Sequence, residues 1–410
     1  MFWLREHDMA INYNAAIPLN MFLQKRAGSI SLTTQQNIDQ LIKSLFANSE
    51  QGFAYDPNDL TTMFQDAAGT VPVTGAGQPV SLMLDKSKGL ALGTNAVLNG
   101  DFSQGGTSWG VLGGVTFSGG KAVYDGLNNP SIYQSVPNIE LGAFYKVRFT
   151  ISNLVKDALA VRIGTGAFTF GFNQNKTYEV ILPAIGSGLL QFPTAGSGAV
   201  LELSDISVKK LSGNHAYQTV SASRPILQRN ATTGVYYLEF DGVDDSLQTN
   251  NIDFTATDKV SLFAGVRKLG SSPAVLVELS ADSNASTGNF IITAPESNNK
   301  YLFRIKGTLG DGLESDSYAP PHTAVITARG SIATALKTIK VNNSVATASI
   351  ATGSGNLGKH PLYIGRRVGT SLLFNGHIYS LIGIGRLTTD AETIALEKSI
   401  AKNTGVTLSV

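Results

Sequence analysis

One stretch near the start of the chain has the spacing of an amphipathic helix. Within residues 30–48, apolar side chains recur three or four positions apart, which places them on one helical face. These side chains are Ile38, Leu41, Ile42, Leu45 and Phe46. Thr33 and Gln36 precede them with the spacing of a capping box. A lone helix of this length is marginal in water, so we expect the stripe to be partner-binding and to pack on a later domain, a sister subunit or another protein.

The next segment, residues 52–94, has no regular period. Pro57, Pro72 and Pro79 interrupt it, and several glycines punctuate it. Apolar residues are still more frequent than in a disordered linker. We interpret residues 1–51 as an N-terminal helical anchor, and residues 52–94 as an ordered, extended attachment segment that lies on the surface of a partner.

Beyond residue 95 the pattern changes to short strands. Segments such as FYKVRFTIS, YEVILP and AVLELSDISV alternate or run apolar, and clusters of Gly, Asn, Pro and Ser separate them. The same pattern continues after residue 213, in VYYLEF, KVSLFAGVR and PLYIGRR. Regularly spaced short strands with turn signals are typical of β-sandwiches. The sequence therefore predicts two of them, at residues 95–212 and 213–410.

A second helical pattern closes the chain. It opens with a capping box from Thr389 to Glu392, and Gly405 marks its end. The expected fold class is mainly β: two tandem antiparallel β-sandwich (jelly-roll) domains, with a short N-terminal α-helical and extended anchor and one C-terminal helix.

Composition narrows the choice of partners. The chain has 31 Lys and Arg against 30 Asp and Glu, which gives a net charge of +1. Such a protein lacks the basic field that nucleic-acid binding needs. No stretch approaches the ~18 apolar residues of a membrane span. There is no cysteine, which excludes disulfides and thiolate metal sites. We therefore expect no nucleic acid, no membrane insertion and no cofactor.

Three segments resemble known families. LYIGRR and FNGHIYSLIGIGRLTTDAETIALEKSIAKNTG, with the earlier YLEFDGVDDSLQT, resemble a laminin-G/concanavalin-like domain over residues 220–405. NAVLNGDFSQGGTSWGV and LELSDISVKKL resemble the first and last strands of a carbohydrate-binding-module-like jelly roll of the family 4/9 type. GFAYDPNDLTTMFQDAAGTVPVTGAGQPVSLMLDKS resembles a segment that recurs in structural proteins of tailed bacteriophages.

Together these resemblances imply a structural protein of a tailed-phage virion, in a head, neck or tail appendage. Its expected partners are other virion proteins and host-surface glycans. A homo-oligomer, a dimer or a trimer, is expected because the helix stripe needs a partner. Two alternatives stay open: a secreted or surface bacterial lectin that binds carbohydrate, and a polysaccharide-degrading enzyme.

Candidate catalytic residues are few. A glycosidase needs two carboxylates facing each other across a sugar. Glu202 and Asp205 lack the spacing of the concanavalin-like glycoside hydrolases and lie in the other sandwich. The five histidines have neither metal-ligand spacing nor a nucleophile motif beside them. We therefore expect a non-catalytic protein.

The densest acidic site is FDGVDD, with Asp241, Asp244 and Asp245. Carboxylates of this kind can hold Ca²⁺, and several laminin-G-like domains bind calcium. The spacing of an EF-hand is absent, however. The favoured interpretation is a tight turn at Gly242 that the aspartates cap, so no metal site is assigned and calcium binding stays an open alternative.

Trp109, Tyr124 and Tyr133 are the aromatic residues that we assign first to a sugar-binding platform. Aromatic faces stack on the C–H side of sugar rings and supply much of the contact area in carbohydrate-binding modules. The alternative is core packing, which large aromatic residues usually provide inside a sandwich. Only Trp109, within SQGGTSWGVLGG, has the sequence surroundings of a loop.

Overall fold

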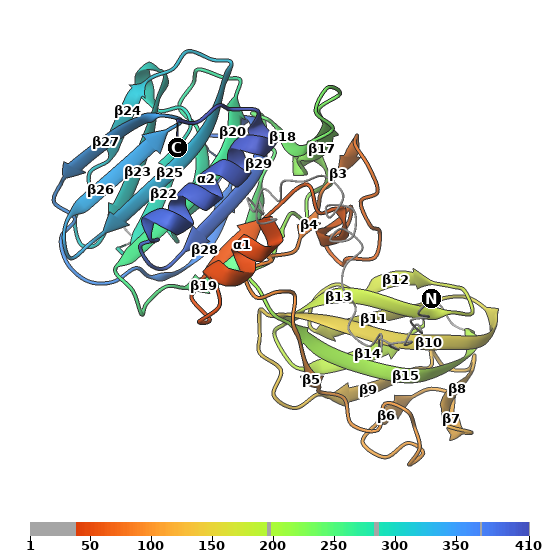
Figure 1. Ribbon diagram of the computed structural model, residues 1–410. Helices are drawn as coiled ribbons and strands as arrows, with labels where there is room; N and C mark the ends of the chain where they lie inside the picture. Colours follow the sequence, from red (N-terminus) through yellow and green to blue (C-terminus); the bar gives the residue numbers. More distant parts are fainter. Residues whose placement is uncertain (1–37, 195–197, 283–286, 370, 410) are drawn as a thin grey trace, which may run out of the picture. The chain divides into compact units, whose positions relative to one another are not determined.

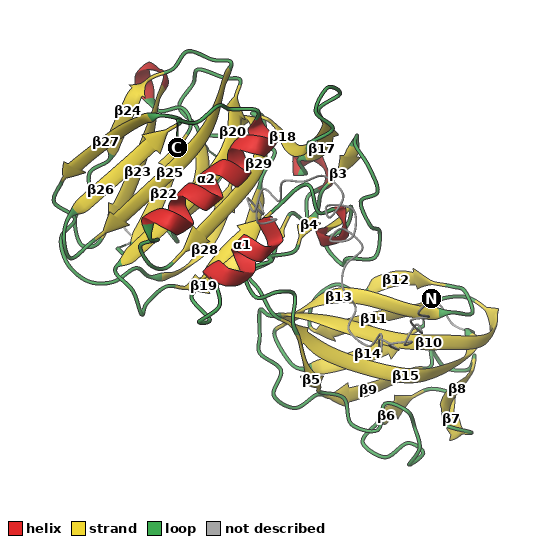
Figure 2. Ribbon diagram, viewed as in Figure 1, coloured by secondary structure: helices red, strands yellow, loops and turns green. Residues whose placement is uncertain are grey.

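The computed structural model describes residues 38–194, 198–282, 287–369 and 371–409. Strands dominate this part of the chain (Figure 2). Its strands form three extended sheets, which we call A, B and C. The predicted mainly antiparallel-β fold with a C-terminal helix is confirmed. The capping box expected at Thr33 and Gln36 lies outside the described residues.

Sheet C forms the middle sandwich, in the order β6-β9-β14-β11-β13-β10-β15-β8-β7, with β12 on β11 and β5 on β15. It consists of β5 (Leu92–Asn95), β6 (Gly110–Leu112), β7 (Val115–Ser118), β8 (Lys121–Asp125), β9 (Ser131–Ser135), β10 (Phe144–Lys156), β11 (Leu159–Gly164), β12 (Thr169–Phe172), β13 (Thr177–Ile185), β14 (Leu189–Pro193) and β15 (Val200–Leu211). Alternate residues of β10 enter the core, as in Val147, Phe149 and Ile151.

Sheets A and B face each other in the C-terminal sandwich, with one apolar core between them. Sheet A has the order β27-β26-β25-β20-β29-β18-β17-β3, with β1 on β29. Its strands are β1 (Gly52–Tyr55), β3 (Gln78–Pro79), β17 (Ile226–Arg229), β18 (Tyr236–Asp241), β20 (Lys259–Lys268), β25 (His322–Ser331), β26 (Leu336–Val341), β27 (Ser344–Ser349) and β29 (Asn375–Ile384).

Sheet B has the order β2-β4-β16-β19-β28-β21-β22-β23-β24. Its strands are β2 (Met63–Phe64), β4 (Leu82–Met83), β16 (Ala216–Tyr217), β19 (Leu247–Asp253), β21 (Val275–Leu279), β22 (Asn289–Thr293), β23 (Lys300–Lys306), β24 (Leu313–Ser317) and β28 (Lys359–Ile364). Short 3₁₀ helices stand at Leu60–Thr62, Ser221–Ser223 and Ser297–Asn299.

Helix α2 (Asp390–Thr404) begins and ends as its sequence predicts. The Thr389 hydroxyl accepts a hydrogen bond from the Glu392 backbone N–H at 3.2 Å, and the Glu392 carboxylate accepts one from the Thr389 N–H at 2.8 Å. Gly405 ends the helix in the left-handed conformation, with φ of 75°. No helix in the described part of the chain is both long enough and apolar enough to cross a bilayer.

The apolar stripe of helix α1 (Ile38–Leu45) is covered by the protein's own C-terminal sandwich. Leu41, Ile42, Leu45 and Phe46 are buried, and Ile38 packs at their edge. They contact residues of β29 and α2, among them Ile382, Ile384, Leu396 and Ile400. The two helices lie side by side on sheet A (Figure 1). The stripe therefore packs on a later domain of the same chain, which is the first of the three partners expected from the sequence.

Residues 52–83 also fold into the C-terminal sandwich instead of forming a separate attachment segment. Strand β1 pairs antiparallel with β29, from Gly52 opposite Ile384 to Tyr55 opposite Leu381. Strand β3 extends sheet A beside β17, and β2 and β4 extend sheet B beside β16. The interpretation of 52–94 as a segment on a partner's surface is thus corrected, because backbone hydrogen bonds of these strands are made within the chain.

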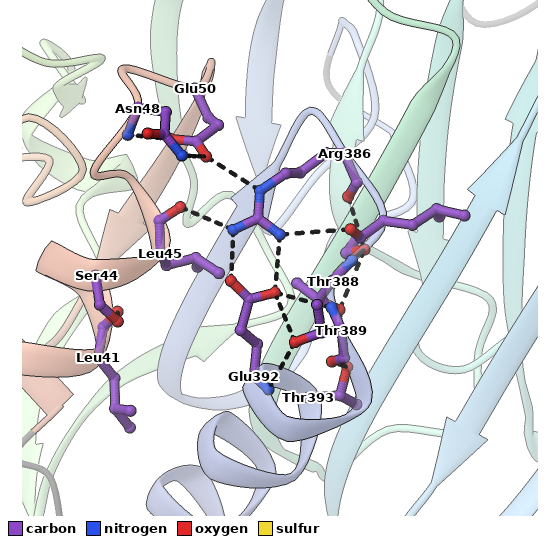
Figure 3. Close-up of polar contacts among 12 residues, drawn as sticks. Leu41, Ser44, Leu45, Asn48, Glu50, Arg386, Thr388, Thr389, Glu392 and Thr393 are labelled. Carbon is purple, nitrogen blue, oxygen red and sulfur yellow. Dashed lines mark hydrogen bonds and ion pairs between the residues drawn. The ribbon is translucent and has the colours of Figure 1, made fainter.

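Arg386 fastens helix α1 to helix α2 (Figure 3). Its two terminal nitrogens donate to the Glu392 carboxylate at 2.8 and 2.6 Å, in a bidentate pair. Its Nε donates to Glu50 at 3.2 Å, and one terminal nitrogen also donates to the Leu45 carbonyl, at the end of α1, at 3.1 Å. The Arg386 hydrogen bonds and ion pairs lower the pKa of Glu392 to about 2 despite its partial burial.

We expect Arg386→Gln to lower the free energy of unfolding by about 1–3 kcal/mol, because it removes charge-assisted hydrogen bonds in a half-exposed setting. Loosening of α1 should also expose residues 38–51 to protease earlier than in the unchanged protein. Denaturant unfolding and limited proteolysis measure the two effects. Arg148→Gln, at an exposed position on β10, is the control. Equal stability of both variants would show that Arg386 does not hold α1 in place.

Candidate functional site

Two of the three aromatic residues assigned to a sugar platform lie in the core of the middle sandwich. Trp109 is 8% exposed, its indole N–H donates to the Asn99 carbonyl at 3.0 Å, and its ring packs on Phe102. Tyr124 is fully buried and donates to the Phe192 carbonyl at 2.9 Å. Both residues therefore pack in the core, which was the alternative to a sugar-binding role.

Tyr133, the third, is half-buried on β9. Gly110 of β6 lies opposite it, so close that a Cβ at Gly110 would fall 2.3 Å from the Tyr133 ring. Since Trp109 and Tyr124 point into the core, the three rings share no exposed face. The structure does not bring them together as a platform.

The acidic side chains considered for catalysis both lie on β15. Glu202 forms an ion pair with Lys121 and accepts a hydrogen bond from Ser152 at 3.1 Å. Asp205 is exposed, with φ of 53°.

The cluster Asp241, Asp244 and Asp245 forms the turn expected at Gly242, where φ is 76°. Asp241 accepts hydrogen bonds from the backbone N–H groups of residues 243 and 244, at 2.8 and 3.3 Å. Asp245 accepts one from the Asp241 N–H at 3.0 Å. The three side chains each place an oxygen within 4.8 Å of the others. Burial, followed by repulsion from Asp241 and Asp244, raises the pKa of Asp245 to about 7.

The outer face of sheet B carries a different set of polar side chains. Residues that alternate with core residues line up across five neighbouring strands, because the register places Gln248 opposite Tyr363, Tyr363 opposite Glu278, Glu278 opposite Ile291, and Ile291 opposite Arg304. We call these five residues the cross-strand row. It runs through β19, β28, β21, β22 and β23, in that order.

A cleft of about 900 Å³ opens at the β19–β28 end of this row. We call it the sheet-B cleft. Its wall on sheet B consists of Tyr217, Gln248, Thr249, Asn250, Asn251, Asp253, Lys359, Pro361 and Tyr363. Residues 140–144 and 210–215 contribute to the rest of its lining.

Hydrogen bonds and ion pairs fix much of the cleft's lining. The Tyr217 hydroxyl donates to the Asn250 side-chain oxygen at 3.1 Å, and the Asn250 amide donates to the Gly142 carbonyl. Lys359 lies 3.8 Å from Asp253. His215 accepts from the Asp85 backbone N–H at 3.0 Å, and burial lowers its pKa to about 4, so that it is neutral at pH 7.

The row becomes more strongly charged toward β23. Arg366 donates to the Gln248 side chain at 2.8 Å, and its guanidinium lies 5.2 Å from the centre of the Tyr363 ring. Arg367 approaches Glu278 at 3.6 Å, and only 1% of that carboxylate side chain is exposed. Burial raises the pKa of Glu278, although Arg367 and Arg304 act in the opposite direction. Apart from the buried Ile291, the cross-strand row thus consists of an amide, a tyrosine and charged groups on one face.

Sequence reasoning selected none of these residues as a site. The available signal was the strand PLYIGRR, in which Tyr363 occupies an outward position before two arginines. Nothing local indicated that Gln248 and Arg304 share its face, because that depends on the order of the strands.

Comparisons with known proteins give a distant similarity of fold. No family model matches the chain, and no curated protein matches it. The sialidase CBM40 of Ruminococcus gnavus bound to α2,3 sialyllactose is 11% identical over 37% of this chain and 97% of its own, with a TM-score of 0.29. The binding domain of botulinum neurotoxin DC in complex with SialylT is 12% identical over 45% of this chain and 48% of its own, with a TM-score of 0.33.

A third structure, the K499G mutant of NanB sialidase from Streptococcus pneumoniae, is 12% identical over 38% of this chain and 26% of its own, with a TM-score of 0.30. The similarity of the chain to these three structures is distant. Similarity at this level identifies neither a family nor a ligand for this chain, and none of these three structures is named as a virion protein.

We expect Asp245→Asn to stabilise the protein at pH 8 by on the order of 1–3 kcal/mol relative to pH 5, after allowance for solvent screening. The native carboxyl keeps its proton up to about pH 7, whereas the unfolded one loses it near pH 4. Native stability therefore falls as the pH rises through this window. Asparagine cannot ionise and avoids that loss.

Thermal unfolding of both proteins at pH 5 and pH 8 measures the difference. Glu179→Gln, at a half-exposed carboxylate on β13, is the control for the loss of one negative charge. A constant difference in melting temperature between Asp245→Asn and the unchanged protein would contradict the prediction.

Proposed function

We propose that this protein is a non-catalytic glycan-binding protein, and that the sheet-B cleft of its C-terminal sandwich holds the sugar. One observation carries the proposal: the cleft combines tyrosine rings with a concentration of side-chain amides. Tyr217 and Tyr363 supply the rings, and Gln248, Asn250 and Asn251 supply the amides. Sugars offer both an apolar C–H face and a rim of hydroxyl groups, and this pair of residue types matches the two.

The size and stiffness of the cleft support the same proposal. Its volume lies within the range of small-molecule sites, roughly 300–1,000 Å³. Gln248 is held by Arg366, and Asn250 is held by Tyr217 and by the Gly142 carbonyl. Amides fixed by their neighbours lose less rotamer freedom when a ligand binds.

The acids of the cleft support a binding role in preference to sugar cleavage. Asp253 faces Lys359, and Glu140 forms an ion pair with Lys210. A glycosidase needs one carboxyl that keeps its proton and a second that attacks or activates water. Hydrogen bonds from Thr255, with a smaller effect of Lys359, lower the pKa of Asp253, so this acid is not set up as a proton donor.

The virion location remains a prediction. The sequence resemblance of residues 52–87 to phage structural proteins is its basis, while the helix stripe no longer supports an oligomer because the chain itself covers it. A lectin that acts without a particle fits the cleft equally well. Incorporation of the labelled protein into phage particles would distinguish the two.

We expect Tyr363→Ala to reduce glycan binding at least tenfold, because it removes a ring from the cleft wall and the surface on which Arg366 lies. A glycan array, followed by calorimetric titration of the glycans that bind, measures the change. Tyr237→Ala is the matched control, since Tyr237 is a half-buried tyrosine on sheet A. Unchanged binding by a folded Tyr363→Ala variant would exclude the sheet-B cleft as the site.

A further inference from the structure

Two guanidinium groups share one buried carboxylate on the outer face of sheet B. Arg304 stands on β23 and Arg367 in the loop that follows β28, and both act on Glu278. Arg367 is the nearer, with its Nε 3.6 Å from a Glu278 oxygen. A third, Arg366, stands beside them in the chain and links this charged region to the cleft through Gln248. We call Arg304, Arg366 and Arg367 the arginine cluster.

The hydrogen-bonding capacity of the cluster is not used up within the described residues. The Nε atoms of all three arginines are buried and have no hydrogen-bond partner there. The two Glu278 oxygens likewise have none at hydrogen-bond geometry, although the Ser280 side chain and the Val368 backbone approach closely enough to favour its charged form. Buried charged groups normally form such bonds.

The charges of the cluster are also unevenly balanced. Glu278 is the only carboxylate that forms an ion pair with it in the described part of the chain. Glu296 and Asp311 attract Arg304 as well, yet burial and then repulsion by Arg367 still lower the pKa of Arg304. An added anion would relieve that repulsion.

A purely structural role accounts for only one of the three arginines. Arg366 donates to the Gly369 carbonyl at 2.7 Å and to Gln248, so it holds its loop against the sheet. Arg367 contributes to the same loop through its backbone N–H, which donates to the Ser371 carbonyl at 3.0 Å. In the described part of the chain, the Arg367 side chain forms an ion pair with Glu278, but no hydrogen bond ties the side chain of Arg304 or Arg367 to a loop in this way.

We propose that the arginine cluster binds the carboxylate of an acidic sugar, so that the sheet-B cleft selects acidic over neutral glycans. The proposal rests on the proposed glycan-binding function and names its substrate class. A guanidinium matches a planar carboxylate with two parallel N–H donors. Tyr363 and Arg304 lie three strands apart, roughly 14 Å at the usual strand spacing, so the ligand is an oligosaccharide and not a single sugar.

The test uses the full chain and three acidic probes: an oligogalacturonide, a hyaluronan tetrasaccharide and sialyllactose. Each is titrated beside its own methyl ester, which keeps the sugar and removes the charge. We expect at least one acid to bind tenfold or more tightly than its ester, because charge-assisted hydrogen bonds to arginine are lost in the ester.

Variants locate the effect. Arg304→Gln and Arg367→Gln should each weaken binding of that acid about tenfold and leave the ester unchanged, whereas Tyr363→Ala should weaken both. Arg304→Lys keeps the charge without the fork and should fall between Arg304→Gln and the unchanged protein. Arg148→Gln is the control for net charge. Melting temperatures of all variants identify any that fail to fold. If Arg304→Gln or Arg367→Gln fails to fold, the other of the two tests whether the arginine cluster binds the acid.

The outcomes separate the two proposals. Equal affinity for acids and esters, or binding of neutral glycans alone, overturns the acidic-sugar inference and leaves the glycan-binding function standing. Preference for an acid that survives both glutamine variants also overturns the inference, since the carboxylate must then bind elsewhere. Binding of no glycan of either kind overturns both.

Discussion

The C-terminal sandwich depends on covering the outer face of strands β20 and β29. Both strands are buried along nearly their whole length, because apolar side chains project from both faces of each strand. The inner face packs against sheet B, and the outer face would meet water without the two helices. Phe263, Ile382 and Ile384 on that outer face contact α1 and α2. Arg386, bonded to both helices, sets their positions where β29 ends.

This constraint ties segments that are remote in sequence into one fold. Strand β29 pairs with β1, β18 and β20, which come from residues more than a hundred positions before it. Strand β1 is buried throughout, and Asp85 accepts the Ala54 backbone N–H at 2.7 Å and the Asn214 N–H at 2.7 Å. The N-terminal segment is therefore part of the C-terminal core, and its apolar residues contribute stability to this sandwich.

Covering sheet A with helices leaves the outer face of sheet B for polar chemistry. There the cross-strand row holds an amide, a tyrosine, two charged residues and the buried Ile291, and the loop after β28 adds two arginines. Glu278 and its arginines are costly to bury without further partners. Such a cost is common where a protein binds a ligand, since buried polar groups that lack partners within the chain are available to one.

Local periodicity in the sequence was enough to predict both helices and many of the strands. The helix stripe from Ile38 to Phe46, the capping box at Thr389 and the alternating strands depend on neighbours within a few residues, so their patterns are legible in the chain. Burial is different: Trp109 and Tyr124 have inward positions that only packing reveals.

The tertiary structure decided which surface covers the helix stripe and which side chains meet on sheet B. Strands β2, β3 and β4 have two residues each, too few to show alternation. The cross-strand row joins Gln248 to Arg304 through strand order and register, and these are set by non-local pairing that competes with the entropy of closing long loops. Sequence patterns record what each segment must bury, whereas the partner that buries it is selected only when the whole chain folds.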